Sequence, residues 1–145
     1  MDSGKTIQLW YQELPGLNKK GEKSTLPKPF IDIQVNYRHQ RMIGIRALVD
    51  SGSDYNLFPG AICEALGIKI KKGKLLPIYG IGMKEPIPAY RHFGIKIFME
   101  GMNFDTFADF SLEHEVSILG QNGFFDKFEK ITFDRVAEKM VFIPK

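Results

Sequence analysis

Two stretches of this sequence place apolar residues at every second position, and no other feature constrains the fold as strongly. The first runs from Ile31 to Tyr37 and the second from Ile43 to Val49, with the polar residues Arg38–Arg41 between them. Successive side chains of a strand point to opposite faces of a sheet, so a period of two predicts strands with one buried face. The pattern therefore predicts two β-strands joined by a hairpin turn.

The rest of the chain shows weaker signals of the same kind. We expect short helices over residues 61–66 and 122–128, with Asn122 as the N-cap of the second. Pro and Gly recur between Leu14 and Pro29, so this segment is expected to be a loop. Further extended segments are expected at residues 7–11, 75–79, 87–98, 104–110, 116–119, 130–133 and 140–143. Roughly eight strands and two short helices are typical of a compact, barrel-like all-β domain.

The chain has 145 residues, which is enough for one hydrophobic core but not for two. We expect an all-β domain over residues 27–145, preceded by an N-terminal strand and extension over residues 1–26. Apolar residues make up 43% and charged residues 26% of the chain, which is the balance of a soluble globular protein.

Charge and cysteine content bear on partners and location. The formal net charge is only +3, with lysines and acidic residues interspersed, so we expect no nucleic-acid partner. No apolar run approaches the ~18 residues of a membrane-spanning helix, so we expect no membrane partner. Cys63 is the only cysteine, which excludes an internal disulfide and favours a reducing, cytoplasmic location.

The second alternating stretch runs directly into the segment Asp50-Ser51-Gly52-Ser53. A carboxylate at the end of a buried strand loses part of its hydration, so it needs hydrogen bonds or a functional use. Gly52 permits a sharp turn of the backbone, and the hydroxyls of Ser51 and Ser53 are able to donate to the carboxylate. Asp50 is therefore the main candidate for a catalytic residue.

An ordinary turn after a strand gives the same pattern, and Asp-Ser-Gly occurs often by chance. Asp2-Ser3-Gly4 repeats the triplet at a polar terminus with no strand before it, and we assign no function to that copy. A second segment supports a functional role for the copy of the triplet at Asp50. The segment Val116–Phe125 begins as another apolar strand that ends in a glycine, and it continues into the second expected helix.

Taken together, Ala47–Phe58 and Ile118–Phe133 resemble segments of the retropepsins, the retroviral-type aspartic proteases and their bacterial relatives. The parts stand in the family's order: an apolar strand with Asp-Ser-Gly-Ser, a glycine-bearing hairpin at Gly80–Glu85, and Ile-Leu-Gly before a short helix. The resemblance covers most of residues 30–145, and its last segment looks especially like the cellular bacterial branch. It implies a closed, barrel-like retropepsin (acid protease) fold with one or two short helices, assembled as a homodimer.

The resemblance also implies a role for each matching position. Asp50 would be the catalytic acid, supported by the other residues of its loop, Ser51, Gly52 and Ser53. Residues implied in binding a peptide substrate are Asp54 and three residues of a hairpin that closes over it, Gly80, Ile81 and Gly82. Residues implied to pack behind the catalytic loop are Ile118, Leu119 and Gly120. The resemblance implies no metal and no other cofactor.

Peptide hydrolysis by carboxyl groups needs two of them, one to take a proton from water and one to protonate the carbonyl oxygen. Aspartic proteases are the standard example of two such groups that share one proton. Only Asp50 has the required setting, because neither Asp109 nor Asp134 precedes a glycine-containing triplet. We therefore expect the second acid to be Asp50 of a second copy, related by a twofold axis.

One position departs from the viral pattern. Viral relatives usually have Arg after the glycine of Ile-Leu-Gly, paired with the acid equivalent to Asp54, whereas this chain has Gln121. The expected function is an aspartic endopeptidase. The alternatives are a retropepsin-like dimerisation or peptide-binding module with little hydrolytic activity, and an unrelated β-barrel in which Asp50 lies in a structural turn.

The remaining candidate residues have simpler explanations. The three histidines, His39, His92 and His114, lack the paired spacing of a metal site and are expected at the surface. Cys63 is expected to be a small core residue rather than a nucleophile. Gly80-x-Gly82 lacks the third glycine and the following helix of a dinucleotide-binding motif.

Overall fold

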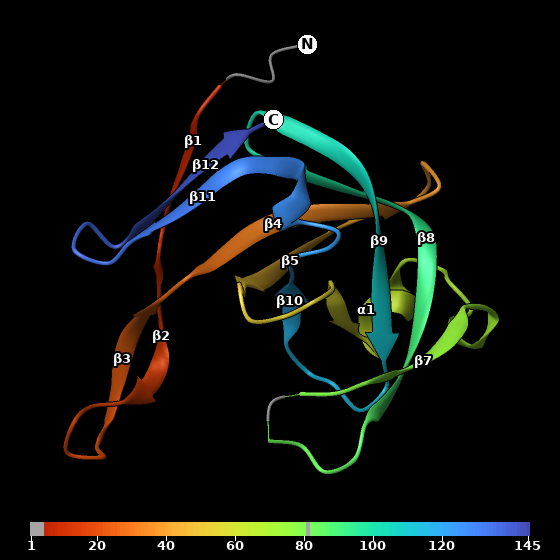
Figure 1. Ribbon diagram of the computed structural model, residues 1–145, viewed down its shortest axis with the longest axis horizontal. Coiled ribbons are helices and arrows are strands. Elements are labelled where there is room, and N and C mark those ends of the chain that lie inside the picture. The colour runs from red at the N-terminus through yellow and green to blue at the C-terminus, as the bar shows by residue number, and fades with distance from the viewer. Residues whose placement is uncertain (1–4, 81) are drawn as a thin grey trace.

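The computed structural model describes residues 5–80 and 82–145, and almost all of its regular structure is β (Figure 1). The strands are β1 (Ile7–Trp10), β2 (Gln12–Leu17), β3 (Lys23–Lys28), β4 (Phe30–Tyr37), β5 (Met42–Val49), β6 (Leu57–Pro59), β7 (Lys74–Ile78), β8 (Ile87–Met99), β9 (Met102–Ser111), β10 (Ser117–Leu119), β11 (Phe128–Asp134) and β12 (Lys139–Pro144). The helical elements are α1 (Gly60–Ala65) and the 3₁₀-helices η1 (Ile70–Lys72) and η2 (Phe125–Lys127).

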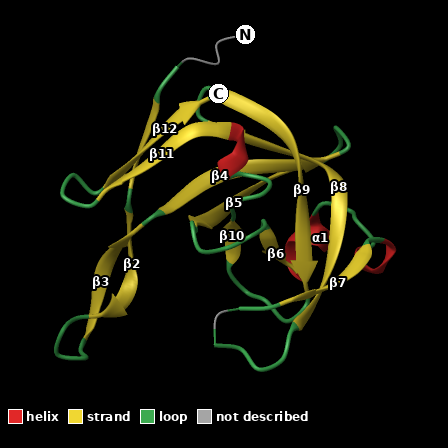
Figure 2. Cartoon of the chain, viewed as in Figure 1, coloured by secondary structure: helices red, strands yellow, loops and turns green. Residues whose placement is uncertain are grey.

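The largest sheet closes on itself into a barrel (Figure 2). Its strand order is β4-β5-β10-β6-β9-β8-β7, and β4 also pairs with β8. The closed ring therefore consists of β4, β5, β10, β6, β9 and β8, and β7 pairs with β8 outside the ring. The expected all-β, closed barrel-like fold with short helices is confirmed.

The alternating residues are buried as their period predicts. Ile31, Ile33 and Val35 of β4 lie in the core, while Asp32 and Gln34 between them are exposed. Burial of an aliphatic side chain of this size stabilises the fold by about 1.5–3 kcal/mol. The hydrophobic effect on one face of each strand therefore sets which way the sheet curves around its core.

A second sheet joins the two ends of the chain. β1 pairs antiparallel with β12, and β12 pairs with β11 in the hairpin that the sequence predicts. Ile7, Met140 and Phe142 from this sheet are buried in the same core cluster as the barrel residues. The N-terminal strand is thus part of the packed structure.

The prediction of a loop over residues 14–29 is wrong. β2 and β3 form a regular antiparallel hairpin there, with six paired positions from Gln12↔Lys28 to Leu17↔Lys23. Pro15 and Pro27 lie inside these strands. They are tolerated because both strands of a two-stranded sheet are edge strands, where a missing N–H costs little.

The predictions of the second helix and of its N-cap also need correction. The helix expected over 122–128 is a single 3₁₀ turn, Phe125–Lys127, and Asn122 is not its cap, because the Asn122 amide donates to the carbonyl of Asp54 at 3.0 Å. The short strand β6 carries no periodicity that a sequence reading would detect. Its place comes from pairing with β9 and β10.

The predicted helix after the Asp50–Ser53 segment is confirmed as α1, which is followed by Gly67 with a φ of +77°. Cys63 of this helix is fully buried, and burial raises the pKa of its thiol to about 12, so the thiol is unreactive at neutral pH. His39 is exposed, but the expected surface position of His92 is wrong. His92 is buried, with its Nε2 atom 2.8 Å from the carbonyl oxygen of Ile70.

In residues 5–80 and 82–145, no helix has the length and apolar character required to cross a membrane.

Candidate functional site

Asp50 is the first residue after β5, at the point where this strand lies beside β10. The two strands run parallel, with Leu48 opposite Ile118 and Val49 opposite Leu119. The backbone N–H of Asp50 donates to the carbonyl of Leu119 at 3.0 Å. Asp50 is half-buried, so its carboxyl group is partly withdrawn from water without being sealed in the core.

The turn after Asp50 holds its carboxylate through the backbone. The N–H of Gly52 donates to Oδ1 of Asp50 at 2.9 Å, and the N–H of Ser53 donates to the Asp50 carbonyl at 3.2 Å. The sequence suggested that the hydroxyl of Ser53 donates to the carboxylate. It donates instead to the carbonyl of Tyr55 at 2.9 Å. We call residues 50–56 the catalytic loop, after the role that the resemblance implies for Asp50, and this loop is shaped mainly by main-chain hydrogen bonds.

The segment after β10 lies against the back of this loop. The N–H of Gln121 donates to the carbonyl of Ser53 at 2.8 Å, and the N–H of Asn122 donates to that of Asp54 at 2.9 Å. The side-chain amide of Gln121 donates to the carbonyl of Ser51 at 2.9 Å. Gln121 thus supports the loop of its own chain.

Asn56 ties three strands together from a position that the sequence reading missed. It is fully buried, its Oδ1 accepts from the N–H of Gly120 at 3.1 Å, and its Nδ2 donates to the carbonyl of Phe107 at 3.0 Å. A buried amide with both ends satisfied fixes the relative position of the segments that it joins. A single asparagine between a tyrosine and an apolar strand gives no local sign of this role.

Gly120 has no room for a side chain. A Cβ atom added to it would lie 2.7 Å from the carbonyl carbon and closer still to the oxygen of Tyr55, and 2.8 Å from the carbonyl oxygen of Ser53. All of these atoms belong to the backbone of the catalytic loop. The close approach explains why a glycine is needed here, as the resemblance implied.

We predict that Gly120→Ala lowers the free energy of unfolding by about 2–3 kcal/mol, because two backbone segments would have to separate. Urea denaturation followed by circular dichroism measures this loss. Gly44→Ala is the matched control, since its Cβ would lie 4.0 Å from its nearest neighbour, the carbonyl oxygen of Ile33. Equal stability of the two variants would contradict the predicted clash.

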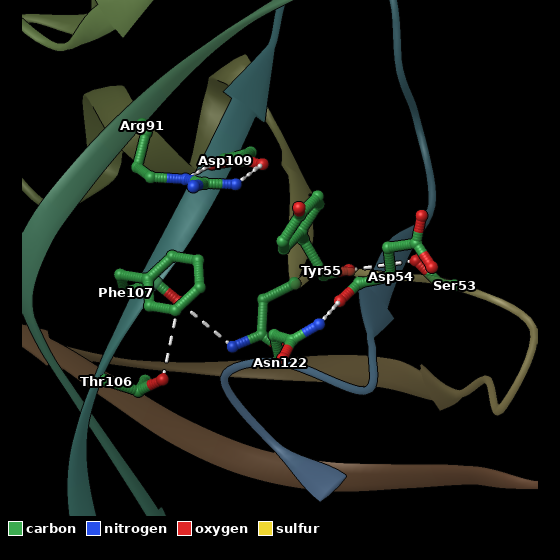
Figure 3. A network of polar contacts seen from close by, with 9 residues as sticks. Ser53, Asp54, Tyr55, Arg91, Thr106, Phe107, Asp109 and Asn122 are labelled. Atoms are coloured by element: carbon green, nitrogen blue, oxygen red, sulfur yellow. Dashed lines mark hydrogen bonds and ion pairs between the residues drawn. The ribbon is translucent and has the colours of Figure 1, made fainter. Parts of the chain in front are cut away.

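A buried ion pair lies beside the catalytic loop (Figure 3). Nε of Arg91 is 2.7 Å from Oδ1 of Asp109, and Nη2 is 3.0 Å from Oδ2. The Asp109 side chain is 0% exposed and that of Arg91 is 20% exposed. The guanidinium also lies 4.4 Å from the ring centre of Tyr55 and 4.7 Å from that of Phe107. The hydrogen bond with Asp109 is the main cause that raises the pKa of Arg91.

This ion pair decides the question of an internal second acid. The two oxygens of Asp109 are both bound by Arg91, so this carboxyl group is committed to that pair and is not free to act together with Asp50. Asp134 lies at the end of β11 and its Oδ1 accepts from the N–H of Ala137 in the β11–β12 turn. Neither rival has the setting of a partner for Asp50.

A cleft of about 710 Å³ opens at the catalytic loop. Sequence-predicted site residues that line it are Asp50, Gly52, Ser53, Asp54, Gly80 and Ile118. Leu119 and Gly120 are buried, and Ser51 is exposed outside this lining. The hairpin tip between β7 and β8 is a turn in which the N–H of Met83 donates to the carbonyl of Gly80 at 3.1 Å. Of the three residues predicted at this tip, Gly80, Ile81 and Gly82, Ile81 lies outside the described residues.

His114 also lines the cleft, which the sequence did not predict. The residue is half-buried rather than at the surface, and its Nε2 atom is buried without a hydrogen-bond partner among the described residues. Burial lowers the pKa of His114, and a backbone hydrogen bond with Val116 opposes this effect. The imidazole is therefore neutral at neutral pH. Within the described part of the chain, no three His, Cys, Asp or Glu side chains are grouped so that they could hold a metal ion.

Comparison with solved structures relates this geometry to known proteins. The chain is similar to a retropepsin-like aspartic protease from Rickettsia conorii, with a TM-score of 0.59 and 15% identity over 95% of this chain and 91% of the other. It is also similar to EIAV protease in complex with the inhibitor HBY-793, with a TM-score of 0.49 and 20% identity over 65% of this chain and 82% of the other. No protein-family model and no curated protein matches the sequence.

Proposed function

From the premise that this chain has the retropepsin-like aspartic protease fold, we propose that it is one half of a homodimeric aspartic endopeptidase. The observation that carries the proposal is the position of Asp50. Its carboxyl group lies half-buried at the end of a barrel strand, in a cleft that a hairpin tip also lines. The two rival carboxylates in the same chain are committed to other bonds.

In the proposed mechanism, a twofold axis brings Asp50 of one copy next to Asp50 of the other. Two carboxyl groups a few ångströms apart cannot both be ionised, so the pair holds one proton. The charged member takes a proton from water, and the resulting nucleophile attacks the peptide carbonyl while the protonated member gives its proton to the carbonyl oxygen. The chemistry uses water and these two side chains alone.

The substrate would be a peptide in an extended conformation between the catalytic loop and the hairpin tip. Backbone hydrogen bonds of the kind found between strands suit such a peptide, because they are independent of its side chains. Asp54, Gly80, Ile81 and Gly82 are the residues proposed to contact it. The single, buried Cys63 supports a reducing, cytoplasmic setting for this activity.

The proposal predicts that cleavage per chain falls on dilution, because a monomer holds only one of the two acids. Cleavage of a peptide library between about pH 3 and pH 7 would be measured over a range of protein concentrations, with sedimentation run in parallel. Activity and dimer fraction are expected to fall together. Constant cleavage per chain where only monomer is present would contradict the shared site.

A retropepsin-like dimerisation or peptide-binding module is the second candidate. The observation that favours it is Gln121, whose amide donates to Ser51 of its own chain and carries no charge to pair with Asp54. A stable dimer that binds peptides without cleaving any of them would support this candidate over the protease.

A further inference from the structure

A hairpin of this chain stands apart from the barrel. We define it as the arm, residues 12–28, which consists of β2, its turn and β3. Figure 1 shows it extending away from the barrel strands. The turn is ordered by its own residues, because Oδ1 of Asn18 accepts from the N–H of Lys20 at 2.9 Å and of Glu22 at 3.0 Å. The arm therefore has a defined shape of its own.

The arm lacks the support that a hairpin normally needs. β2 and β3 pair with each other and with no other strand in the described residues. Leu17 is 59% and Leu26 is 36% exposed. A two-stranded hairpin is only marginally stable in water, and it usually packs a face against another element. Leu26 lies on the same face as its partner Leu14 and Leu17 lies on the opposite face, so both faces of the hairpin expose apolar side chains that a partner would cover.

The construction of the arm favours contact through its faces. Pro15 in β2 and Pro27 in β3 have no N–H to offer to an added strand, which makes both edges poor templates for pairing. Leu14 and Leu26 are opposite each other and lie on one face. Leu26 also covers Gly16, whose added Cβ would lie 2.6 Å from the Leu26 Cδ1 atom. A partner would pack on these side chains.

The base of the arm lies directly beside the catalytic aspartate. β3 ends at Lys28, and the carbonyl of the next residue, Pro29, accepts from the N–H of Val49 at 2.9 Å, one residue before Asp50. In Figure 1 the arm extends down the side of the view on which the yellow loop after β5 emerges. A second copy that brings its Asp50 next to this one therefore comes close to the base of the arm.

We propose that the arm packs against the second copy of the chain and holds the two Asp50 half-sites together. This inference rests on the proposed function, since it takes the site to be incomplete in one chain. Six strand residues span about 20 Å, which gives the arm the length to reach along a second copy that approaches its base. It adds contact area toward the roughly 1,200–2,000 Å² that a stable interface buries.

The test uses two arm variants of the full chain and one control. In the first, residues 14–26 are replaced by Asn-Gly, which leaves β1 on β12 and β4 on β5. In the second, Leu17→Asp and Leu26→Asp are combined so that the hairpin is kept. The control is Val136→Asp, which changes an apolar residue that is 98% exposed in the β11–β12 turn. Circular dichroism confirms that each protein is folded.

Sedimentation equilibrium is expected to show a dimer dissociation constant at least tenfold higher in both arm variants and unchanged in the control. Peptide cleavage by the arm variants should return at high protein concentration. An unchanged dissociation constant in both arm variants would overturn the inference, whether or not cleavage is lost. A dimer that depends on the arm but cleaves no peptide would instead refute the protease and leave the arm's role standing.

Discussion

Asp50→Asn is expected to lower peptide cleavage by roughly 10³-fold or more, because an amide neither takes a proton from water nor shares one with its twin. The fold should be retained. Oδ1 of Asp50 accepts a hydrogen bond from the N–H of Gly52, and the side-chain oxygen of an asparagine is able to accept it equally well. The measurement is kcat/KM with a cleaved library peptide.

Asp32→Asn is the matched control for this variant. Its side chain is 77% exposed on β4 and its ion pair with Arg46 is long at 3.9 Å. We expect its activity to equal that of the unmodified protein. Equal activity of the Asp50→Asn protein would remove the proposed mechanism altogether.

Mixing the two proteins sharpens the result. If one part of unmodified chain is refolded with three parts of Asp50→Asn chain, most unmodified chains enter mixed dimers with only one carboxyl group. Cleavage should then fall to about a quarter of that of the same amount of unmodified chain refolded alone. A rate equal to that of the unmixed protein would mean that each chain is complete by itself.

Arg91→Met is expected to give the largest loss of stability, about 3–5 kcal/mol in urea denaturation at constant protein concentration. The change leaves the carboxylate of Asp109 buried and charged with no cation beside it. Asp109→Asn should cost less, since the guanidinium of Arg91 is already 20% exposed and can turn toward water.

The double variant Arg91→Met with Asp109→Asn shows whether the uncompensated charge of Asp109 causes the loss of stability. It should be more stable than Arg91→Met alone, because the second change removes the uncompensated charge. Arg91→Lys controls for charge alone, because it keeps the cation. It loses the bidentate hydrogen bonds to Asp109 and the stacking on Tyr55 and Phe107. A double variant less stable than Arg91→Met would refute the argument from a stranded charge.

Local patterns of the sequence predict the elements whose residues face one core. The period of two places Ile31, Ile33 and Val35 inside the barrel, since alternation within a strand reports burial directly. The turn at Asp50–Ser53 is likewise local, because Gly52 bonds back to the carboxylate two residues earlier. The position of Asp50 at the end of a strand was therefore predictable from sequence, whereas its place beside β10 comes from the pairing of two distant segments.

Other features exist only because distant segments meet. Asn56 bonds Gly120, which is 64 positions away, and Arg91 binds Asp109 across two strands of the barrel, so no local pattern marks either pair. Closure of the barrel also buries His92, which looks like a surface residue in the sequence.

The sequence by itself determined the strands with a clear period of two, such as β4 and β5, and which carboxylate ends one of them, because periodicity and turn chemistry act within a few residues. Only the tertiary structure decided that Asp109 is held by Arg91 and that residues 12–28 are a hairpin rather than a loop. Both depend on long-range pairing, whose free energy is set by geometry that forms when the chain closes on itself.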